Sequence, residues 1–399
     1  MFPFAEMDLA IFDHMLYLVL NPLVYLAVIM MIFQYQRAVN NERKIHSVRV
    51  TSVTEQTLLS LGYGILIGVL ASVASVSLKV TLSVYDALYI WIVAVLIVVI
   101  RNRFVCFPYI TGMLGIIAFV SKMWKQGSEL PVLGTIWEGI GYLNMASIIA
   151  VIAILQIAEA ILIWLDGGNK ASPIFVKSKR GQLVGAFHIQ KMWLLPLFVF
   201  IASQPGTTIE LSPLAGIVLG IFPLPVVLGY GDLAISRTPK QKSRQTAGLL
   251  MIYAGVLFTF AYTVNYSPWI LLSASVFVIG AYEAIVMIGR RNEMLERALY
   301  SRPERGMRIL AVLRDSTAAK LGLQSGEVVM KVNGVEVNDQ TELYDAVASQ
   351  PVYVKMEVEN LHKEIKFLQT PLYQGEHHSF GIIFVPDDEQ ATKYMKIGD

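Results

Sequence analysis

The chain has 399 residues, of which 55% are hydrophobic and only 16% are charged, and its mean hydropathy is +0.56. An average soluble domain carries about 25% charged residues, so this composition indicates a membrane protein. The net charge of +2, without a clustered basic excess, excludes a nucleic-acid groove. The lone Cys106 excludes an intrachain disulfide framework.

Nine apolar segments are long enough to cross a membrane as helices, because about 20 residues span a hydrocarbon core of about 30 Å. The sixth is the weakest, since Lys191 interrupts it. If the sixth and seventh segments form a re-entrant pair around residues 204–206, seven spans remain with the same parity. We therefore expect a polytopic α-helical membrane domain over residues 1–288. The nine segments are residues 15–33, 57–78, 82–100, 104–120, 140–165, 187–203, 209–230, 246–264 and 268–288.

The basic residues of the connecting loops indicate the orientation. Loops on one side carry fifteen Lys and Arg residues, whereas loops on the other side carry three. Because positively charged loops are retained in the cytoplasm, this bias predicts an N-terminus outside and a C-terminus in the cytoplasm. The last helix is expected to continue as a linker helix over residues 289–305. The fifteen residues are Arg37, Arg43, Lys44, Arg49, Arg101, Arg103, Lys170, Lys177, Lys179, Arg180, Lys191, Arg237, Lys240, Lys242 and Arg244.

Residues 306–386 have the pattern of a small, soluble α+β barrel capped by two helices, and residues 387–399 form a polar tail. Strands are expected at residues 307–313, 352–360, 363–370 and 377–386, with a hairpin over residues 328–337. The Asn333-Gly334 pair suits a type I′ turn in that hairpin. Ser316 can cap a one-turn helix, and Asp339 with Glu342 forms a capping box for a second helix.

This module resembles a PDZ domain. The pattern SxAxxxGLxxGDxIxxVNGxxV of bacterial PDZ modules is matched at Ser316, Ala318, Gly322, Leu323, Gly326, Val332, Asn333, Gly334 and Val337. Glu327 and Thr317 depart from it, because Asp and Pro are usual there. A PDZ domain binds an extended peptide at a sheet edge, often through its C-terminal carboxylate.

The order of the elements is that of the circularly permuted bacterial type, which implies where the peptide groove lies. Phe380, Gly381 and Ile382 would form the carboxylate loop, and the groove strand would begin at Ile383. The residues Gln340, Tyr344 and Val347 of the second helix would face that strand. In the alternative, Phe380 and Ile382 only fill the core and the groove is degenerate.

No catalytic, cofactor or metal motif is found, and we expect a protein that is not an enzyme. Residues 165–168, LDGG, resemble the aspartate motif of site-2 proteases, but none of the six His begins the required HExxH helix. We therefore interpret Asp166 as a polar residue at a helix exit. A transporter would need Glu159 or Glu283, the candidate ionisable residues within spans. Interfacial placement or an interhelical hydrogen bond is the plainer alternative for both.

Two small-residue spacings, Gly64-xxx-Gly68 and Gly216-xxx-Gly220, permit close helix packing, and we expect it within the chain. The segment SPIFVKSKRGQLVGAF, residues 172–187, is basic enough to contact anionic lipid or a partner, although retention in the cytoplasm explains its charge equally well.

Taken together, the multispan region, the single C-terminal PDZ-like module and the stretches at residues 21–44 and 172–187 resemble the MinJ family, topological determinants of division in rod-shaped Gram-positive bacteria. The resemblance implies a membrane-anchored scaffold in the cell membrane, at septa and poles, with its PDZ-like module in the cytoplasm. It would bridge a DivIVA-like protein to a MinD-like protein, and so place the division inhibitor that contains MinC. Other division proteins, a peptide ligand and the lipid bilayer are further implied partners, and self-association is open. A PDZ regulator of a membrane protease or sensor kinase, and a transporter with a PDZ tail, are the alternatives.

Overall fold

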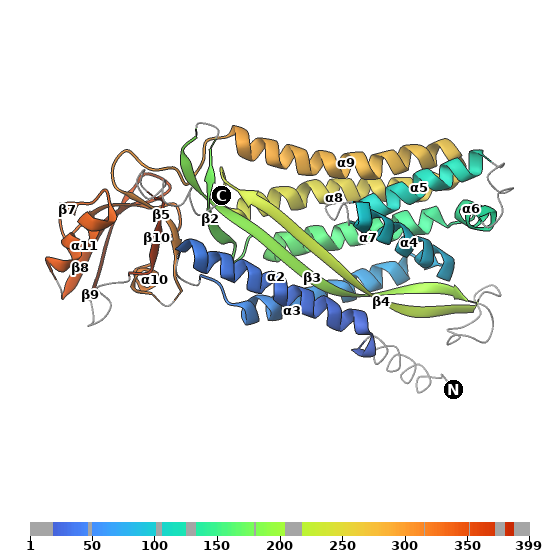
Figure 1. The fold of residues 1–399 in the computed structure, drawn as a ribbon, viewed down its shortest axis with the longest axis horizontal. Helices are drawn as coiled ribbons and strands as arrows, with labels where there is room; N and C mark the ends of the chain where they lie inside the picture. Colours follow the sequence, from blue (N-terminus) through green and yellow to red (C-terminus); the bar gives the residue numbers. More distant parts are fainter. Residues whose placement is uncertain are drawn as a thin grey trace.

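The computed structural model describes residues 19–46, 50–100, 106–124, 133–178, 181–203, 218–314, 316–350, 352–371 and 380–386. These residues form an elongated helical region, through which a long β-hairpin runs, and a β-rich module at one end of it (Figure 1). Three connections lie at the end that carries the module. They are the last turns of α2 (Pro22–His46), the hairpin of β2 (Ser172–Lys177) with β3 (Leu183–Ser203), and the connection from β4 (Val218–Ala234) to α8 (Pro239–Thr263). These are three of the connections in which the basic residues are concentrated.

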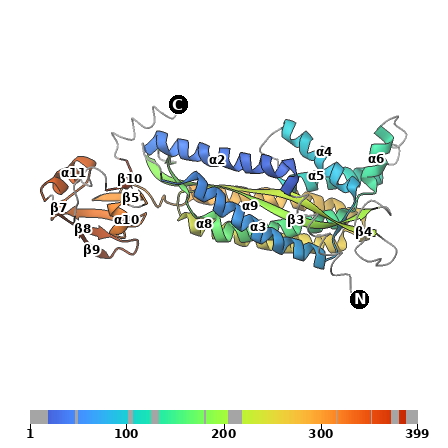
Figure 2. The same ribbon diagram turned by 90° about the horizontal axis from the view of Figure 1, so that it is seen from below.

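Five helices of the described region are long and apolar enough to cross a membrane. They are α2 (Pro22–His46), α3 (Val53–Ser77), α7 (Met145–Leu162, extended by the π-helical turn η3, Ile163–Gly167), α8 (Pro239–Thr263) and α9 (Pro268–Leu295). The apolar helices α4 (Val84–Ile100) and α5 (Phe107–Met123) are shorter. Together with the short α6 (Leu133–Gly141), these two lie in the half that is remote from the module (Figure 2). Seven of the nine predicted segments are therefore helical, and α7 is the most deeply buried of the long helices.

The sixth and seventh predicted helices are strands, so this part of the prediction is wrong. β3 (Leu183–Ser203) and β4 (Val218–Ala234) pair antiparallel from Phe187 opposite Ala234 to Ser203 opposite Val218. Proline explains the difference, because a proline inside a helix removes a hydrogen bond and costs about 3 kcal/mol. Pro196 lies in β3 opposite Pro225 of β4. The proposed re-entrant turn at residues 204–206, and residues 209–217 of the seventh segment, lie outside the described residues.

The outer edge of β3 is closed by side chains of α2 and α3. The Tyr35 hydroxyl lies 3.3 Å from both the nitrogen and the carbonyl oxygen of Met192. The Ser72 hydroxyl accepts from the Phe198 N–H at 2.9 Å and lies 3.1 Å from the Pro196 carbonyl oxygen. The two-residue strand β1 (Thr81–Leu82) pairs parallel to the end of β3. These contacts give hydrogen-bond partners to a strand edge that lipid could not supply.

The Gly64-xxx-Gly68 spacing allows the backbone of β3 to approach α3. A Cβ at Gly64 would lie 2.3 Å from the carbonyl oxygen of Leu194, and a Cβ at Gly68 would lie 2.5 Å from Cδ of Pro196. The predicted packing within the chain is confirmed for this pair, but the partner is a strand, not a helix. Gly216 of the second spacing lies outside the described residues.

The contacts of β3 also fix which backbone groups of β4 point away from the hairpin. Met192, Pro196 and Phe198 turn their backbone groups toward α2 and α3. In an antiparallel pair, two residues that lie opposite each other either both face the partner strand or both face away from it. The β4 residues opposite Met192, Pro196 and Phe198 therefore direct their backbone groups to the outer edge of β4, which pairs with no other strand of the described region. Proline has no N–H, so a proline at such a position loses no ladder bond. The outward residues of β4 are Pro223, Pro225, Val227 and Gly229.

The C-terminal module contains the elements predicted for residues 306–386. Its six strands form one sheet in the order β10-β5-β6-β8-β9, with β7 beside β6. Asn333 and Gly334 both have positive φ, 51° and 84°, as the predicted turn requires. Ser316 and Asp339 accept the predicted capping bonds from Ala319 and Glu342. The elements are β5 (Met307–Val312), α10 (Thr317–Lys320), β6 (Val328–Val332), β7 (Val335–Glu336), α11 (Gln340–Ala348), β8 (Tyr353–Glu359), β9 (Ile365–Pro371) and β10 (Ile382–Phe384).

The connection between the two parts is helical only at its start. α9 continues past residue 288, as expected, but ends at Leu295, so residues 296–305 are not helical. The Leu299 N–H donates to the Ile235 carbonyl, and Tyr300 bridges to Gly185 of β3. A helix over the same residues would use these backbone groups in its own hydrogen bonds.

Candidate functional site

The free edge of β10 is the first feature of the candidate site. β10 ends the sheet, and no strand of the described region covers its outer side. The Gly381 carbonyl accepts from the Leu313 N–H at 2.7 Å, and the Val385 N–H donates to the Arg308 carbonyl at 2.9 Å, so both groups face β5. Because directions alternate along a strand, the backbone groups of Ile382 and Phe384 point to the open edge.

The structure brings β10 and α11 together around one apolar core, as the predicted groove requires. Phe380 and Val347 are buried in that core, and Ile382 packs against it. Tyr344 is 45% exposed on α11, and Gln340 lines a small surface pocket with Phe384. Tyr344 thus supplies an exposed side chain, Gln340 a half-buried one and β10 a strand edge, whereas Phe380 and Val347 hold the two elements together.

The loop before β10 is fastened to α10. Gly381 has a φ of +71°, and a Cβ there would lie 2.2 Å from Cβ of Ser316. The Phe380 carbonyl accepts from the Ala318 N–H at 3.0 Å. In the part of the chain that the structure describes, the Gly381 N–H has no acceptor. Residues 377–379 of the predicted loop lie outside that part.

The opposite side of β10 packs on the helical region. Ile383 belongs to the same buried cluster as Phe187 of β3 and Tyr300 of the connection. The rings of Phe187 and Tyr300 meet edge to face, with centroids 5.1 Å apart. Leu310, the residue that the register shift inserts into β5, contacts Gly185 at the same place. The predicted residue Ile383 therefore belongs to an internal contact surface.

A tyrosine hydroxyl and a set of ion pairs also lie at the contact between the module and the helical region. Burial raises the pKa of the Tyr300 hydroxyl. Glu55 at the start of α3 pairs with Arg314 at 2.5 Å and with Lys170 at 2.6 Å. Solvent screens such ion pairs, so they orient the module more than they stabilise it.

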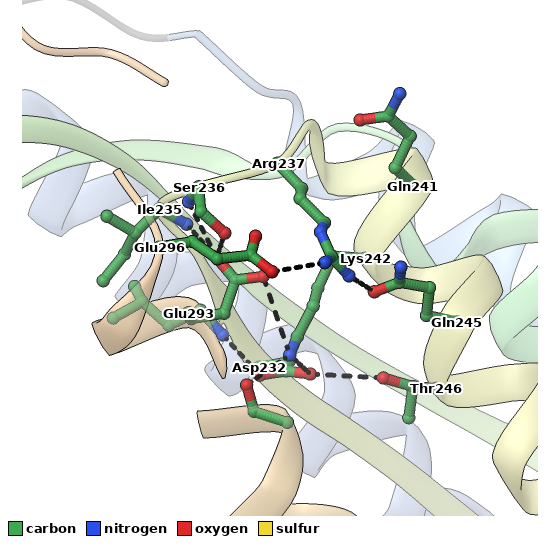
Figure 3. A network of polar contacts seen from close by, with 12 residues as sticks. Asp232, Ile235, Ser236, Arg237, Gln241, Lys242, Gln245, Thr246, Glu293 and Glu296 are labelled. Carbon is green, nitrogen blue, oxygen red and sulfur yellow. Dashed lines mark hydrogen bonds and ion pairs between the residues drawn. The ribbon is translucent and has the colours of Figure 1, made fainter. Parts of the chain in front are cut away.

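A buried polar network holds the end of α9, where the chain leaves for the module (Figure 3). The Lys242 ammonium of α8 lies 3.6 Å from the Asp232 carboxylate and 3.8 Å from that of Glu293, and donates to the Gly289 carbonyl at 2.9 Å. Glu293 accepts from the N–H groups of Ile235 and Ser236, both at 2.8 Å. The network joins the end of β4, the start of α8 and the end of α9.

The outer part of this network is exposed. Arg237 pairs with Glu296 at 2.6 Å and also donates to Gln245. Sequence reasoning placed Lys242 in a loop, but it is buried in α8. The signal that could have found it is the presence of Asp232 and Glu293 at the adjoining ends of two other apolar segments.

Asp166 is also more than a helix exit. It is buried in the π-helical turn, and both of its carboxylate oxygens lie 3.1 Å from the Lys191 ammonium. The Trp193 indole N–H donates to the same carboxylate at 3.3 Å. Lys191 therefore lies in β3, not in a loop, and its charge within an apolar stretch is balanced.

The two acidic residues considered for transport have different surroundings. Glu283 accepts from the Tyr109 hydroxyl, an interhelical bond between α9 and α5. Glu159 is buried, and Gln156 of its own helix donates to it at 2.8 Å. The interhelical alternative thus describes Glu283, whereas the hydrogen bond of Glu159 lies within its own helix. No group of three or more His, Cys, Asp or Glu suited to a metal ion occurs among the described residues.

Comparison with known proteins identifies relatives, although no family model matches. The chain is 28% identical over 382 residues to the cell division topological determinant MinJ of Bacillus subtilis strain 168. The aligned residues cover 93% of this chain and 94% of that protein. Probable MinJ proteins of Lacticaseibacillus paracasei and of Lacticaseibacillus casei strain BD-II are each 24% identical over 258 residues, 61% of this chain and 67% of the relative. The resemblance inferred from the sequence is confirmed, and the chain is a homologue of MinJ over nearly its whole length.

Proposed function

We propose that this chain is a membrane-anchored scaffold that helps to select the division site, and that it acts by binding and not by catalysis. The observation that carries the proposal is the similarity to MinJ along 93% of the chain. In the proposed arrangement, the helical region crosses the cell membrane several times, and the module lies in the cytoplasm. The basic connections at the module's end of the molecule favour this orientation.

The module would act as a PDZ-type peptide reader. A peptide added to β10 would bond to the outward backbone groups of Ile382 and Phe384, and its side chains would contact Tyr344 and Gln340. A C-terminal carboxylate would receive the N–H of Gly381, which has no acceptor within the described chain. The predicted ligands are segments of a DivIVA-like marker at septa and poles and of a MinD-like protein, through which MinC is placed.

The proposal is tested with a fluorescent fusion of the full chain in Bacillus subtilis cells that lack their own MinJ. We expect the fusion to concentrate at septa and poles and to restore normal cell length. Tyr344→Asp should abolish the part of this behaviour that depends on the groove. Phe367→Asp is the matched control, because Phe367 is 77% exposed on β9, at the opposite edge of the sheet.

The outcomes separate the two parts of the proposal. A uniform peripheral signal without rescue of cell length would refute the role in division. Correct localisation and rescue by both variants would leave that role standing but show that the groove is not used. Equal failure of both variants would point to general damage to the sheet, which the melting temperature of the purified chain would reveal.

A further inference from the structure

An apolar cavity lies between the helices and the free edge of β4. It has a volume of about 390 Å³ and is bounded by α4, α5, α7, β3 and β4. Its wall along α7 extends from Ile148 to Glu159. Eleven residues of helix rise about 16 Å, which is close to half of the roughly 30 Å hydrocarbon core. The cavity therefore has the length of the acyl layer of one leaflet.

The mouth of the cavity opens on the apolar surface of the molecule. Trp91 of α4 lines it and is 54% exposed, and Val227 of β4 lines it on the other side. The neighbouring residues of α4 on the same surface, Leu88, Ile92 and Val95, are exposed apolar side chains. A surface of this kind faces lipid in a membrane-spanning region, so the molecule best placed to enter the cavity is a lipid.

One end of the cavity is polar. Glu159 lines it there, and its carboxylate is held by Gln156 of the same helix, which donates to it at 2.8 Å. The outward backbone groups of Val227 and Gly229 also border this wall. Unpaired polar groups in an apolar interior are costly, so an occupant that offers hydrogen bonds is favoured over a purely apolar one.

A second, smaller cavity of about 70 Å³ continues from this polar end. It shares Glu159 and Gly229 with the first cavity and is also lined by Asp232, Thr246 and Arg290. Its walls thus offer carboxylates to a cation and a guanidinium to an anion. Glu159 is eight residues from the end of the π-helical turn, a rise of about 12 Å, so this cavity lies on the module's side of the apolar one.

We propose that the two cavities together bind one aminophospholipid from the leaflet on the module's side. One acyl chain fills the apolar cavity. The ammonium of the head group donates to the carboxylates of Glu159 and Asp232, and the phosphate meets Arg290. The proposal does not depend on the role in division.

The test uses the full chain in nanodiscs that contain a phosphatidylethanolamine with a photoreactive acyl chain. We expect cross-links on the cavity walls of α4, α7 and β4, and we expect unlabelled phosphatidylethanolamine to compete. Phosphatidylcholine, whose ammonium has no N–H, should compete about tenfold less well, which corresponds to about 1.4 kcal/mol. Glu159→Gln should reduce this preference without abolishing labelling.

A cavity-filling variant and its control complete the test. Ala94→Phe places a ring inside the cavity and should lower labelling by about tenfold, the effect of displacing about two methylene groups. Val95→Phe adds the same ring at the adjacent, 56% exposed position and should leave labelling unchanged. If wild-type cross-links scatter equally over the exposed faces of α2, α3 and α8, or if Ala94→Phe is labelled like the wild type, the proposal is refuted. Equal competition by both lipids would refute the assignment of the head group. The wild-type map decides the question even if Ala94→Phe does not fold.

Discussion

Replacing Lys191 by methionine should be among the most destabilising single changes in the helical region. The ammonium of Lys191 lies 3.1 Å from both oxygens of the Asp166 carboxylate, and both side chains are buried. In Lys191→Met the Trp193 indole N–H, at 3.3 Å, is the one donor to the carboxylate that remains among the described residues. Breaking a buried ion pair by removing one partner costs about 3–5 kcal/mol, because an uncompensated charge is left.

The double variant with Asp166→Asn should recover most of this loss, since the amide carries no charge and still accepts from the indole. We expect a coupling of about 2 kcal/mol or more between the two sites. The assay is unfolding of the purified chain in mild detergent, followed by tryptophan fluorescence for the wild type, both single variants and the double variant. Lys177→Met, at an exposed position of β2 (Ser172–Lys177), is the control and should change stability by less than about 0.5 kcal/mol. Additive costs, or a Lys191→Met variant as stable as this control, would refute the reasoning.

Three further substitutions test close packing and buried polar contacts. Gly381→Ala should lower the melting temperature of the module, because the added Cβ meets a side-chain carbon at 2.2 Å; Gly334→Ala, with a similar φ but open space, should cost only about 1–2 kcal/mol. Gly64→Ala should destabilise the helical region, because the added Cβ would lie 2.3 Å from a carbonyl oxygen of β3. The control is Gly62→Ala, whose Cβ would have no neighbour within 4 Å and which should be neutral or slightly stabilising. Equal melting temperatures of the two variants would contradict the close packing of α3 on β3. Glu293→Ala leaves the buried N–H of Ile235 and the half-buried N–H of Ser236 without their acceptor. The loss should cost about 1–3 kcal/mol for the buried group and less for the other, and it should speed proteolysis of the connection after α9. An unchanged cleavage rate would argue against the anchoring role of Glu293.

The C-terminal module shows how far local signals reach. Its caps at Ser316 and Asp339, and its positive-φ turn at Asn333 and Gly334, are set by neighbouring residues and could be predicted from the sequence. The contact of the module with the helical region could not, because it brings Leu310 of β5 against Gly185 of β3, residues far apart in the chain. The predicted groove residues thus divide between an open edge, a core and an internal interface, and this division is a property of the assembled sheet.

The β3–β4 hairpin shows where hydropathy fails. A long apolar run has the same mean hydropathy whether it is a helix or a strand. Because nearly all of its residues are apolar, it also has no alternation of apolar and polar residues that could distinguish the two. The prolines at 196, 223 and 225 were the available signal, and their meaning depends on the register that sets Pro196 opposite Pro225.

The sequence by itself determined which segments are apolar, where basic residues concentrate and where a separate β-rich module begins, because these follow from composition and from neighbours in the chain. The tertiary structure alone decided that two of the apolar segments pair as strands, that Gly64 and Gly68 admit a strand, and that Asp166 meets Lys191. The physical reason is that burial is favoured by side-chain type, whereas hydrogen bonds and ion pairs between distant segments form only where the fold brings donor and acceptor within about 3 Å.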